Sequence, residues 1–142
     1  MIRLLEREDL PAYMKLLSQL TVVGHHTMEE LEERLTCVGR NPFHSIFVVT
    51  GASRDLIACA TLLIEPKFIR GLSYLGHIED VCVDSAYRGR GYGEMIVNYL
   101  VGVADSLGCY KVTLCCSDKN VPFYTKCGFE KAQRQMIVRS RL

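Results

Sequence analysis

The stretch that decides the fold is Arg88-Gly89-Arg90-Gly91-Tyr92-Gly93. A strand-like run, 78–83, precedes it, and apolar residues at helical spacing, 93–107, follow it. Glycines at alternate positions let a backbone turn tightly and bring its N–H groups against phosphate oxygens, and a following helix adds the positive end of its dipole. Glycine-rich turns also occur as plain connections. Because two arginines lie here as well, we expect a pyrophosphate cradle between a strand and a helix.

Composition predicts one domain over residues 1–142. The net charge is +1 and 49% of the residues are hydrophobic, which gives no general signal for nucleic acid or membrane binding. No apolar run approaches the ~20 residues of a membrane helix, and residues 1–9 carry alternating charges, so we expect neither secretion nor a membrane span. The seven cysteines include no C-x-x-C pair, so neither a disulfide framework nor a metal site is expected. Most of them read as small buried residues, although Cys82, Cys115 or Cys116 could face a site.

The expected elements form a single α/β domain of the mixed α+β type, in which about four helices flank a central mixed sheet. Strands are expected at 2–5, 46–50, 56–64, 76–83, 111–116 and 129–138. Helices are expected at 9–20, 93–107 and 120–127, and a further helix is expected to start at 27 and to be ended by Gly39 and Pro42. A Rossmann domain would place its glycine turn after the first strand. A nucleotide P-loop would continue with Lys and Ser or Thr, whereas Glu94 and Met95 follow Gly93. Both nucleotide-binding alternatives are therefore disfavoured.

Arg88, Gly91 and Gly93 fit the R/Q-x-x-G-x-G/A pattern, and with it the chain resembles the Gcn5-related N-acetyltransferase (GNAT) superfamily. Residues 76–84, 108–112 and 119–129 and the loop 20–24 resemble segments of glucosamine 6-phosphate N-acetyltransferases. The resemblance implies direct transfer of an acetyl group from acetyl-CoA to the 2-amine of D-glucosamine 6-phosphate, a step toward UDP-N-acetylglucosamine. The alternatives are a GNAT enzyme for another small amine or a protein amine, and a non-catalytic acyl-CoA-binding module.

The resemblance also implies a cofactor site for acetyl-CoA and no metal. Pantetheine is expected beside the strand 81–83, where a backbone N–H would face the thioester oxygen. The expected cofactor residues are Val81, Cys82, Val83, Arg88, Gly89, Arg90, Gly91, Tyr92, Gly93, Asn120, Phe123 and Tyr124.

Three residues are candidates for the chemistry. An amine must lose its proton before it attacks a thioester, and Glu79 or Asp80 would accept that proton directly or through water. Adjacent strand residues point to opposite faces, so we expect the two carboxylates to differ in role unless a bulge intervenes. The resemblance implies Glu79 as the base, Asp80 as a sugar or amine contact and Tyr124 as the acid that stabilises the leaving thiolate.

Other residues are implied as substrate contacts. Lys67, Lys111 and Arg139 would hold the phosphate, Tyr110 and Thr21 would contact the substrate beside Glu79 and Asp80, and Arg139 would come from the neighbouring subunit of a homodimer. Cys115 departs from the pattern, because the members compared carry an acidic residue there. A neutral thiol supplies neither charge nor a strong acceptor.

The tripeptide Ser140-Arg141-Leu142 differs from the S-K-L peroxisomal address only by Arg for Lys. We therefore expect a peroxisome or glycosome-like location, with the cytoplasm as the alternative if the tripeptide merely ends a basic tail.

Overall fold

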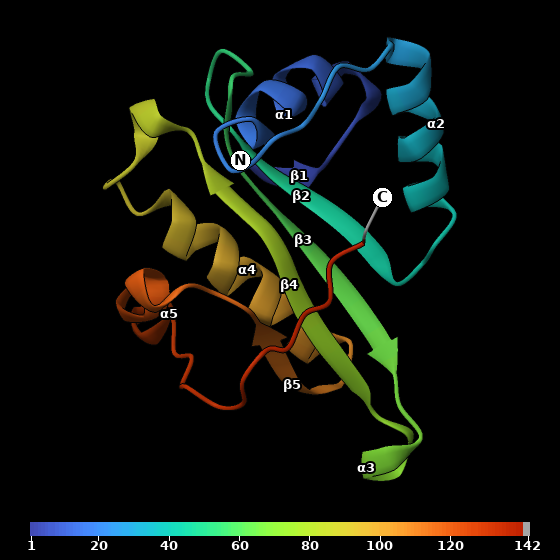
Figure 1. Ribbon diagram of the computed structural model, residues 1–142, viewed down its shortest axis with the longest axis vertical. Helices are drawn as coiled ribbons and strands as arrows, with labels where there is room; N and C mark the ends of the chain where they lie inside the picture. Colours follow the sequence, from blue (N-terminus) through green and yellow to red (C-terminus); the bar gives the residue numbers. More distant parts are fainter. Residues whose placement is uncertain (141–142) are drawn as a thin grey trace.

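The computed structural model describes residues 1–140 and is built on a five-stranded mixed sheet in the order β1-β2-β3-β4-β5 (Figure 1). The first four strands pair antiparallel, and β5 pairs parallel with β4 at the edge of the sheet. The strands are β1 Ile2–Leu4, β2 His44–Thr50, β3 Leu56–Pro66, β4 Tyr74–Val83 and β5 Cys109–Leu114. The mixed α/β fold expected from the sequence is confirmed.

Helices cover both faces of this sheet. The α-helices are α1 Leu10–Leu17, α2 Met28–Gly39, α3 Ile69–Leu72, α4 Tyr92–Ser106 and α5 Val121–Lys126, and short 3-10 turns are η1 Arg7–Asp9, η2 Ser85–Tyr87 and η3 Asp118–Asn120. The larger core lies under α4, where Ile96, Val97 and Leu100 pack on β3 and β4. A smaller core lies under α1, around Leu16, Val48 and Cys82. No helix in residues 1–140 has the length and apolar character needed to cross a bilayer.

Local sequence explains where the N-terminal helices begin and end. Thr27 caps α2 by accepting a hydrogen bond from the Glu30 N–H, and the Glu30 carboxylate accepts from the Thr27 N–H. Helix α1 ends at Leu17, three residues before the expected end. Gln19 and Leu20 donate to carbonyls three residues back instead of four, so the chain tightens into a turn there.

The expected closing strand, 129–138, is wrong for this protomer. Residues 130–140 are exposed, and no strand is assigned to this stretch of the described chain. Its apolar side chains predict a strand, but Met136, Ile137 and Val138 are 89%, 60% and 97% exposed. A strand needs a neighbour for its backbone hydrogen bonds, and no strand of residues 1–140 pairs with this segment. In Figure 1 the segment after α5 crosses in front of β4 and β3.

The last paired strand is also shifted from its expected range of 111–116 to Cys109–Leu114. Its register follows β4, with Tyr74 opposite Cys109 and Ile78 opposite Leu114. Because that pairing stops at Leu114, Cys115 and Cys116 lie beyond the strand and are exposed.

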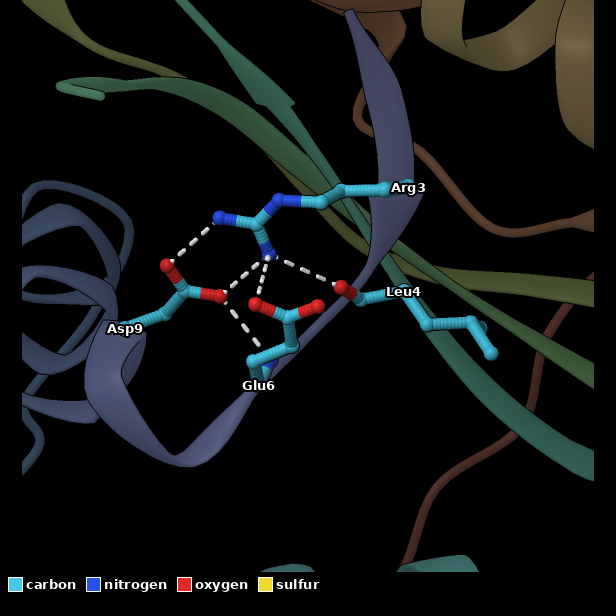
Figure 2. Close-up of polar contacts among 4 residues, drawn as sticks. All are labelled: Arg3, Leu4, Glu6 and Asp9. Atoms are coloured by element: carbon cyan, nitrogen blue, oxygen red, sulfur yellow. Dashed lines mark hydrogen bonds and ion pairs between the residues drawn. The ribbon is translucent and has the colours of Figure 1, made fainter. Parts of the chain in front are cut away.

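A partly buried ion pair joins β1 to the turn η1 that precedes α1 (Figure 2). The Arg3 guanidinium donates to both Asp9 carboxylate oxygens, at 2.6 and 2.8 Å, and the Glu6 N–H donates to the same carboxylate at 2.8 Å. Asp9 is only 8% exposed. The hydrogen bonds from Arg3 hold the pKa of Asp9 below its usual value, against the opposing effect of burial.

We expect Asp9→Asn to lower the free energy of unfolding at pH 7 by about 1–3 kcal/mol, because the Arg3 charge loses its two short hydrogen bonds to the Asp9 carboxylate and keeps the longer ion pair with Glu6, at 3.6 Å. A carboxyl whose pKa is lowered by folding stabilises the protein above its unfolded pKa, about 3.9, and loses that effect as pH falls through the folded pKa. The gap between wild type and variant should therefore close below about pH 4. Urea unfolding from pH 2 to 7 measures this difference in the free energy of unfolding. The control is Asp105→Asn, a substitution at an exposed aspartate. A gap that stays constant at acid pH would contradict this assignment.

Candidate active site

The site opens where β4 parts from β5. Pairing between these strands ends at Ile78 and Leu114, so β4 continues from Glu79 to Val83 without β5 beside it. The register with β3 shifts by one residue over the same stretch, which sets Asp80 and Val81 opposite the single residue Ala60. This is a β-bulge, and Asp80 adopts the left-handed region with φ 51°. The Cys59 thiol donates to the Asp80 carbonyl at 3.6 Å and ties the bulge to β3.

The bulge exchanges the faces of β4. Ile78 packs in the core under α4, whereas Cys82, an even number of residues later, packs in the core under α1. In a regular strand two side chains four residues apart share one face, so their packing on opposite faces reflects the bulge. The bulge does intervene at the two carboxylates, so Glu79 and Asp80 line the same cavity although they are adjacent in the strand.

One cleft, of about 420 Å³, follows the glycine turn. It is called the glycine-turn cleft here, and its walls are β4, the turn, the start of α4 and α5. The residues that line it include Val81, Cys82, Val83, Tyr87, Arg88, Gly89, Gly91, Tyr92, Gly93, Asn120, Phe123 and Tyr124.

Two glycines shape this cleft. Gly91 has φ 83° and precedes the first residue of α4, so the chain enters the helix through a conformation that residues with a Cβ rarely adopt. A Cβ on Gly93 would lie 3.1 Å from the Phe123 ring and 3.3 Å from Val83. The N-terminus of a 15-residue helix is thus held open toward the cleft, a geometry suited to a phosphate group.

A second cleft, of about 380 Å³, adjoins the first. It is called the carboxylate cleft here, and it is lined by Leu20, Ile78, Glu79, Asp80, Val81, Leu114, Cys115, Cys116, Ser117, Asn120 and Tyr124. Leu20, Val81, Asn120 and Tyr124 border both clefts. A group bound in one cleft can therefore meet a group bound in the other only beside these four residues.

Tyr124 is fixed at this junction by its neighbours. Its ring makes edge contacts with Phe123 and Phe129, with centroids 4.9 and 6.1 Å away. Burial raises the pKa of Tyr124, and the nearby thiols of Cys116 and Cys127 raise it further. Its phenol therefore stays protonated at neutral pH and is available as a hydrogen-bond or proton donor at the junction.

This arrangement agrees with comparisons to known proteins. The acetyltransferase (GNAT) family model matches residues 7–129. The chain belongs to the GNAT family of acetyltransferases. It is 41% identical over 138 residues to the glucosamine 6-phosphate N-acetyltransferase of Arabidopsis thaliana, which covers 95% of this chain and 93% of that protein. The Trypanosoma brucei brucei enzyme of the same name is 38% identical over 135 residues, covering 95% and 92%.

The fold also matches that of a relative whose structure has been solved. The crystal structure of the glucosamine-6-phosphate N-acetyltransferase from Arabidopsis thaliana superposes with a TM-score of 0.93 and 39% identity, covering 98% of this chain and 97% of that one.

Most of the predicted cofactor residues of this GNAT protein line the glycine-turn cleft, and Arg90 is the one that does not. Its guanidinium lies over the Tyr87 ring, 5.6 Å from the centroid, and the Tyr87 hydroxyl donates to the Asp55 carboxylate. Arg90 is thus exposed and lies over Tyr87, which lines the cleft, and its predicted contact with the pyrophosphate stays a prediction. Arg88 lines the cleft, and its Nε donates to the Val83 carbonyl at 3.0 Å.

The predicted phosphate contacts lie elsewhere. Among the described residues, neither cleft is lined by Thr21, Lys67, Tyr110, Lys111 or Arg139. Lys67 pairs with Glu65 at 2.7 Å, and Lys111 lies 5.6 Å from the centre of the Tyr110 ring. Thr21 follows Leu20, which borders both clefts, and Arg139 lies in the exposed C-terminal segment.

Sequence reasoning missed Gln19. Its side-chain amide donates to the Asp84 carboxylate at 2.9 Å, and its carbonyl accepts from the Ser85 N–H at 2.8 Å. These bonds join the end of α1 to the segment that leads into the glycine turn, across more than sixty residues of sequence. A lone Gln after a helix gives no signal of this kind, because the contact depends entirely on tertiary structure.

Proposed function

We propose that this acetyltransferase moves the acetyl group of acetyl-CoA to the 2-amine of D-glucosamine 6-phosphate by direct transfer. The products are N-acetyl-D-glucosamine 6-phosphate and CoA, on the route to UDP-N-acetylglucosamine. The observation that carries the proposal is the junction of the glycine-turn cleft and the carboxylate cleft beside Tyr124. The names of relatives that match 95% of the chain support the choice of acceptor.

Acetyl-CoA fits the glycine-turn cleft by its chemistry. Its pyrophosphate suits the turn at the N-terminus of α4, where Arg88 adds charge. Its pantetheine suits the β4 segment 81–83, which lies beyond the pairing with β5 and can offer backbone groups to an extended chain. The thioester would then lie at the junction of the clefts, close to Tyr124.

The acceptor amine fits the carboxylate cleft. Glu79 and Asp80 both face it because of the bulge, so one can take the proton of the amine while the other orients the sugar. The amine attacks the thioester carbonyl, and the protonated Tyr124 stabilises the departing CoA thiolate. No covalent acetyl-enzyme is needed, because both substrates meet at one junction.

A thiol-release assay with acetyl-CoA tests this function. The acceptor panel comprises glucosamine 6-phosphate, glucosamine, galactosamine 6-phosphate, a polyamine and a lysine peptide. We expect glucosamine 6-phosphate to give the highest kcat/KM. A higher value with the peptide or polyamine would favour a different GNAT acceptor, and binding of CoA without turnover on any amine would favour a non-catalytic module.

Cys115→Asp is expected to keep kcat/KM for glucosamine 6-phosphate or raise it by up to about tenfold. A carboxylate in this cleft would give the amine a charge-assisted hydrogen bond that a thiol does not. Steady-state kinetics measure the change, and Cys37→Asp on α2, also an exposed cysteine, is the control. A collapse of turnover in a correctly folded Cys115→Asp protein would contradict the expectation.

Gln19→Met is expected to raise the KM for acetyl-CoA about fivefold at little change in kcat. Methionine keeps the length of the side chain but loses both hydrogen bonds to Asp84 and Ser85, which together position the segment before the turn. The control is Ser18→Ala, whose hydroxyl bonds only the Lys15 carbonyl of its own helix. A change confined to kcat would contradict a positioning role.

We also propose a homodimer in which Arg139 completes the neighbouring subunit's site. Two features support it: the exposed apolar residues Met136 to Val138, and the edge strand β5, which pairs only with β4. Strand pairing between protomers would use both. The Lys67 and Lys111 side chains lie outside the clefts, so the phosphate of the acceptor needs a further cation.

Mixing two inactive variants tests the shared site. Arg139→Ala and Glu79→Gln proteins should each lose activity, and co-refolding them should restore about a quarter of wild-type turnover, since half of the dimers carry one intact site. Full activity in a form that sediments as a monomer would contradict the proposal.

For the location, we propose the peroxisome or a glycosome-like organelle. The support is the Ser140-Arg141-Leu142 address. Arg141 and Leu142 lie outside the described residues. Fusing the tripeptide to a fluorescent reporter tests the address, and a diffuse cytosolic signal would defeat it.

A further inference from the structure

The carboxylate cleft holds two thiols that acetyl transfer does not use. Cys115 and Cys116 follow the end of β5, are free and exposed, and both line the cleft beside Glu79 and Asp80. The other cysteines differ in position. Cys59 and Cys82 are buried, Cys109 and Cys127 are partly buried, and Cys37 is exposed on α2, outside both clefts.

Cys116 lines the carboxylate cleft together with Tyr124, and Tyr124 borders both clefts. The Cys116 thiol also contributes to the raised pKa of Tyr124. Under the proposed function the acceptor amine and the thioester meet at the junction of the clefts. The CoA sulfur would then lie at the end of the carboxylate cleft that Tyr124 borders, in the same cleft as the Cys116 thiol.

We propose that Cys116 is a site of reversible modification by CoA disulfides, a reaction that rests on the proposed binding of CoA. The Cys116 thiolate attacks one sulfur of a CoA disulfide, the S–S bond breaks, and one CoA leaves as thiolate. The new bond is a mixed disulfide between Cys116 and the CoA that remains in the glycine-turn cleft. The disulfide is the oxidant, so no other reactant is needed.

The cleft makes this reaction selective. A disulfide whose nucleotide binds at the glycine turn presents its sulfur to Cys116 at high effective concentration, whereas glutathione disulfide has no such anchor. The product occupies the glycine-turn cleft and the junction, so it blocks acetyl-CoA and prevents an acceptor amine from meeting a thioester. Thiol reductants reverse it, so activity would follow the ratio of CoA to CoA disulfide.

Intact-protein and peptide mass spectrometry after incubation with CoA disulfide tests the proposal. We expect one CoA per chain on Cys116, formed roughly tenfold faster than the glutathione adduct, slowed by acetyl-CoA and removed by dithiothreitol with return of activity. Cys37→Ser should be modified as wild type is. Cys116→Ser and Cys116→Ala should take up no CoA and keep their own starting activity in CoA disulfide.

Adducts on Cys37 or Cys115 in place of Cys116, equal rates with both disulfides, or no protection by acetyl-CoA would overturn it. Calorimetry with CoA separates the two proposals. Binding of CoA with normal turnover and an unmodified Cys116 defeats this inference alone, whereas a protein that does not bind CoA defeats the proposed function as well.

Discussion

Tyr124→Phe is expected to lower kcat by about 10²-fold, the scale of a general acid, with little change in either KM. The phenol is fixed between Phe123 and Phe129 at the junction of the clefts, so phenylalanine keeps the packing and removes only the hydroxyl group. Burial raises the pKa of Tyr124 above its ordinary value near 10. The acid form thus persists through neutral and weakly alkaline pH and is lost only above the raised pKa.

Stopped-assay kinetics from pH 6 to 10 check this expectation. In wild type, deprotonation of Tyr124 should cause no fall in kcat below about pH 10. The ratio of the wild-type kcat to the Tyr124→Phe kcat should therefore be constant across that range. Tyr99→Phe is the matched control, because Tyr99 lies on α4 against Phe47 and outside both clefts. Equal turnover of Tyr124→Phe and wild type at every pH would remove Tyr124 from the mechanism.

Gly93→Val is expected to abolish measurable saturation by acetyl-CoA and to lower the free energy of unfolding by about 1–3 kcal/mol. A Cβ at this position already comes within 3.1 Å of the Phe123 ring and 3.3 Å of Val83, and valine adds two methyl groups. Relief requires α4 or α5 to shift, and both form walls of the glycine-turn cleft.

Gly102→Ala on the same helix is the control. A Cβ at Gly102 meets nothing within 4 Å, so alanine should stabilise α4 by about 0.5–1 kcal/mol and leave catalysis unchanged. Urea unfolding and acetyl-CoA titration measure both variants. A Gly93→Val protein with wild-type affinity and stability would show that the close approach has no role.

Local signals predicted most of the fold. The Thr27 and Glu30 capping box marked the start of α2, and the glycine turn marked the start of α4, since both depend on neighbours in sequence. The 129–138 strand failed for the opposite reason, because local sequence cannot tell whether a partner strand lies beside a segment. Most of the residues that line the glycine-turn cleft were predicted from the motif together with the family resemblance.

The remaining features of the site depend on tertiary contacts. The stacking of Arg90 on Tyr87 and the bridge from Gln19 to Asp84 join segments or orient side chains in ways that a motif does not encode. The sequence left open whether β4 has a bulge at Asp80, because Glu79-Asp80-Val81 is also compatible with a regular strand. Its position depends on the registers of both neighbouring strands.

The extra residue in β4 also makes this strand unequally sensitive to changes in chain length. Deleting Asp80 would remove the bulge and leave Val81 alone opposite Ala60, so Cys82 would stay opposite Cys59 and on the face under α1. The regularly paired residues 75–79 include no extra residue, so a one-residue deletion there would turn one side of the strand to the opposite face of the sheet. Loss of the Asp80 codon should therefore disturb the fold less than loss of a codon at 75–79, while it removes one carboxylate from the carboxylate cleft.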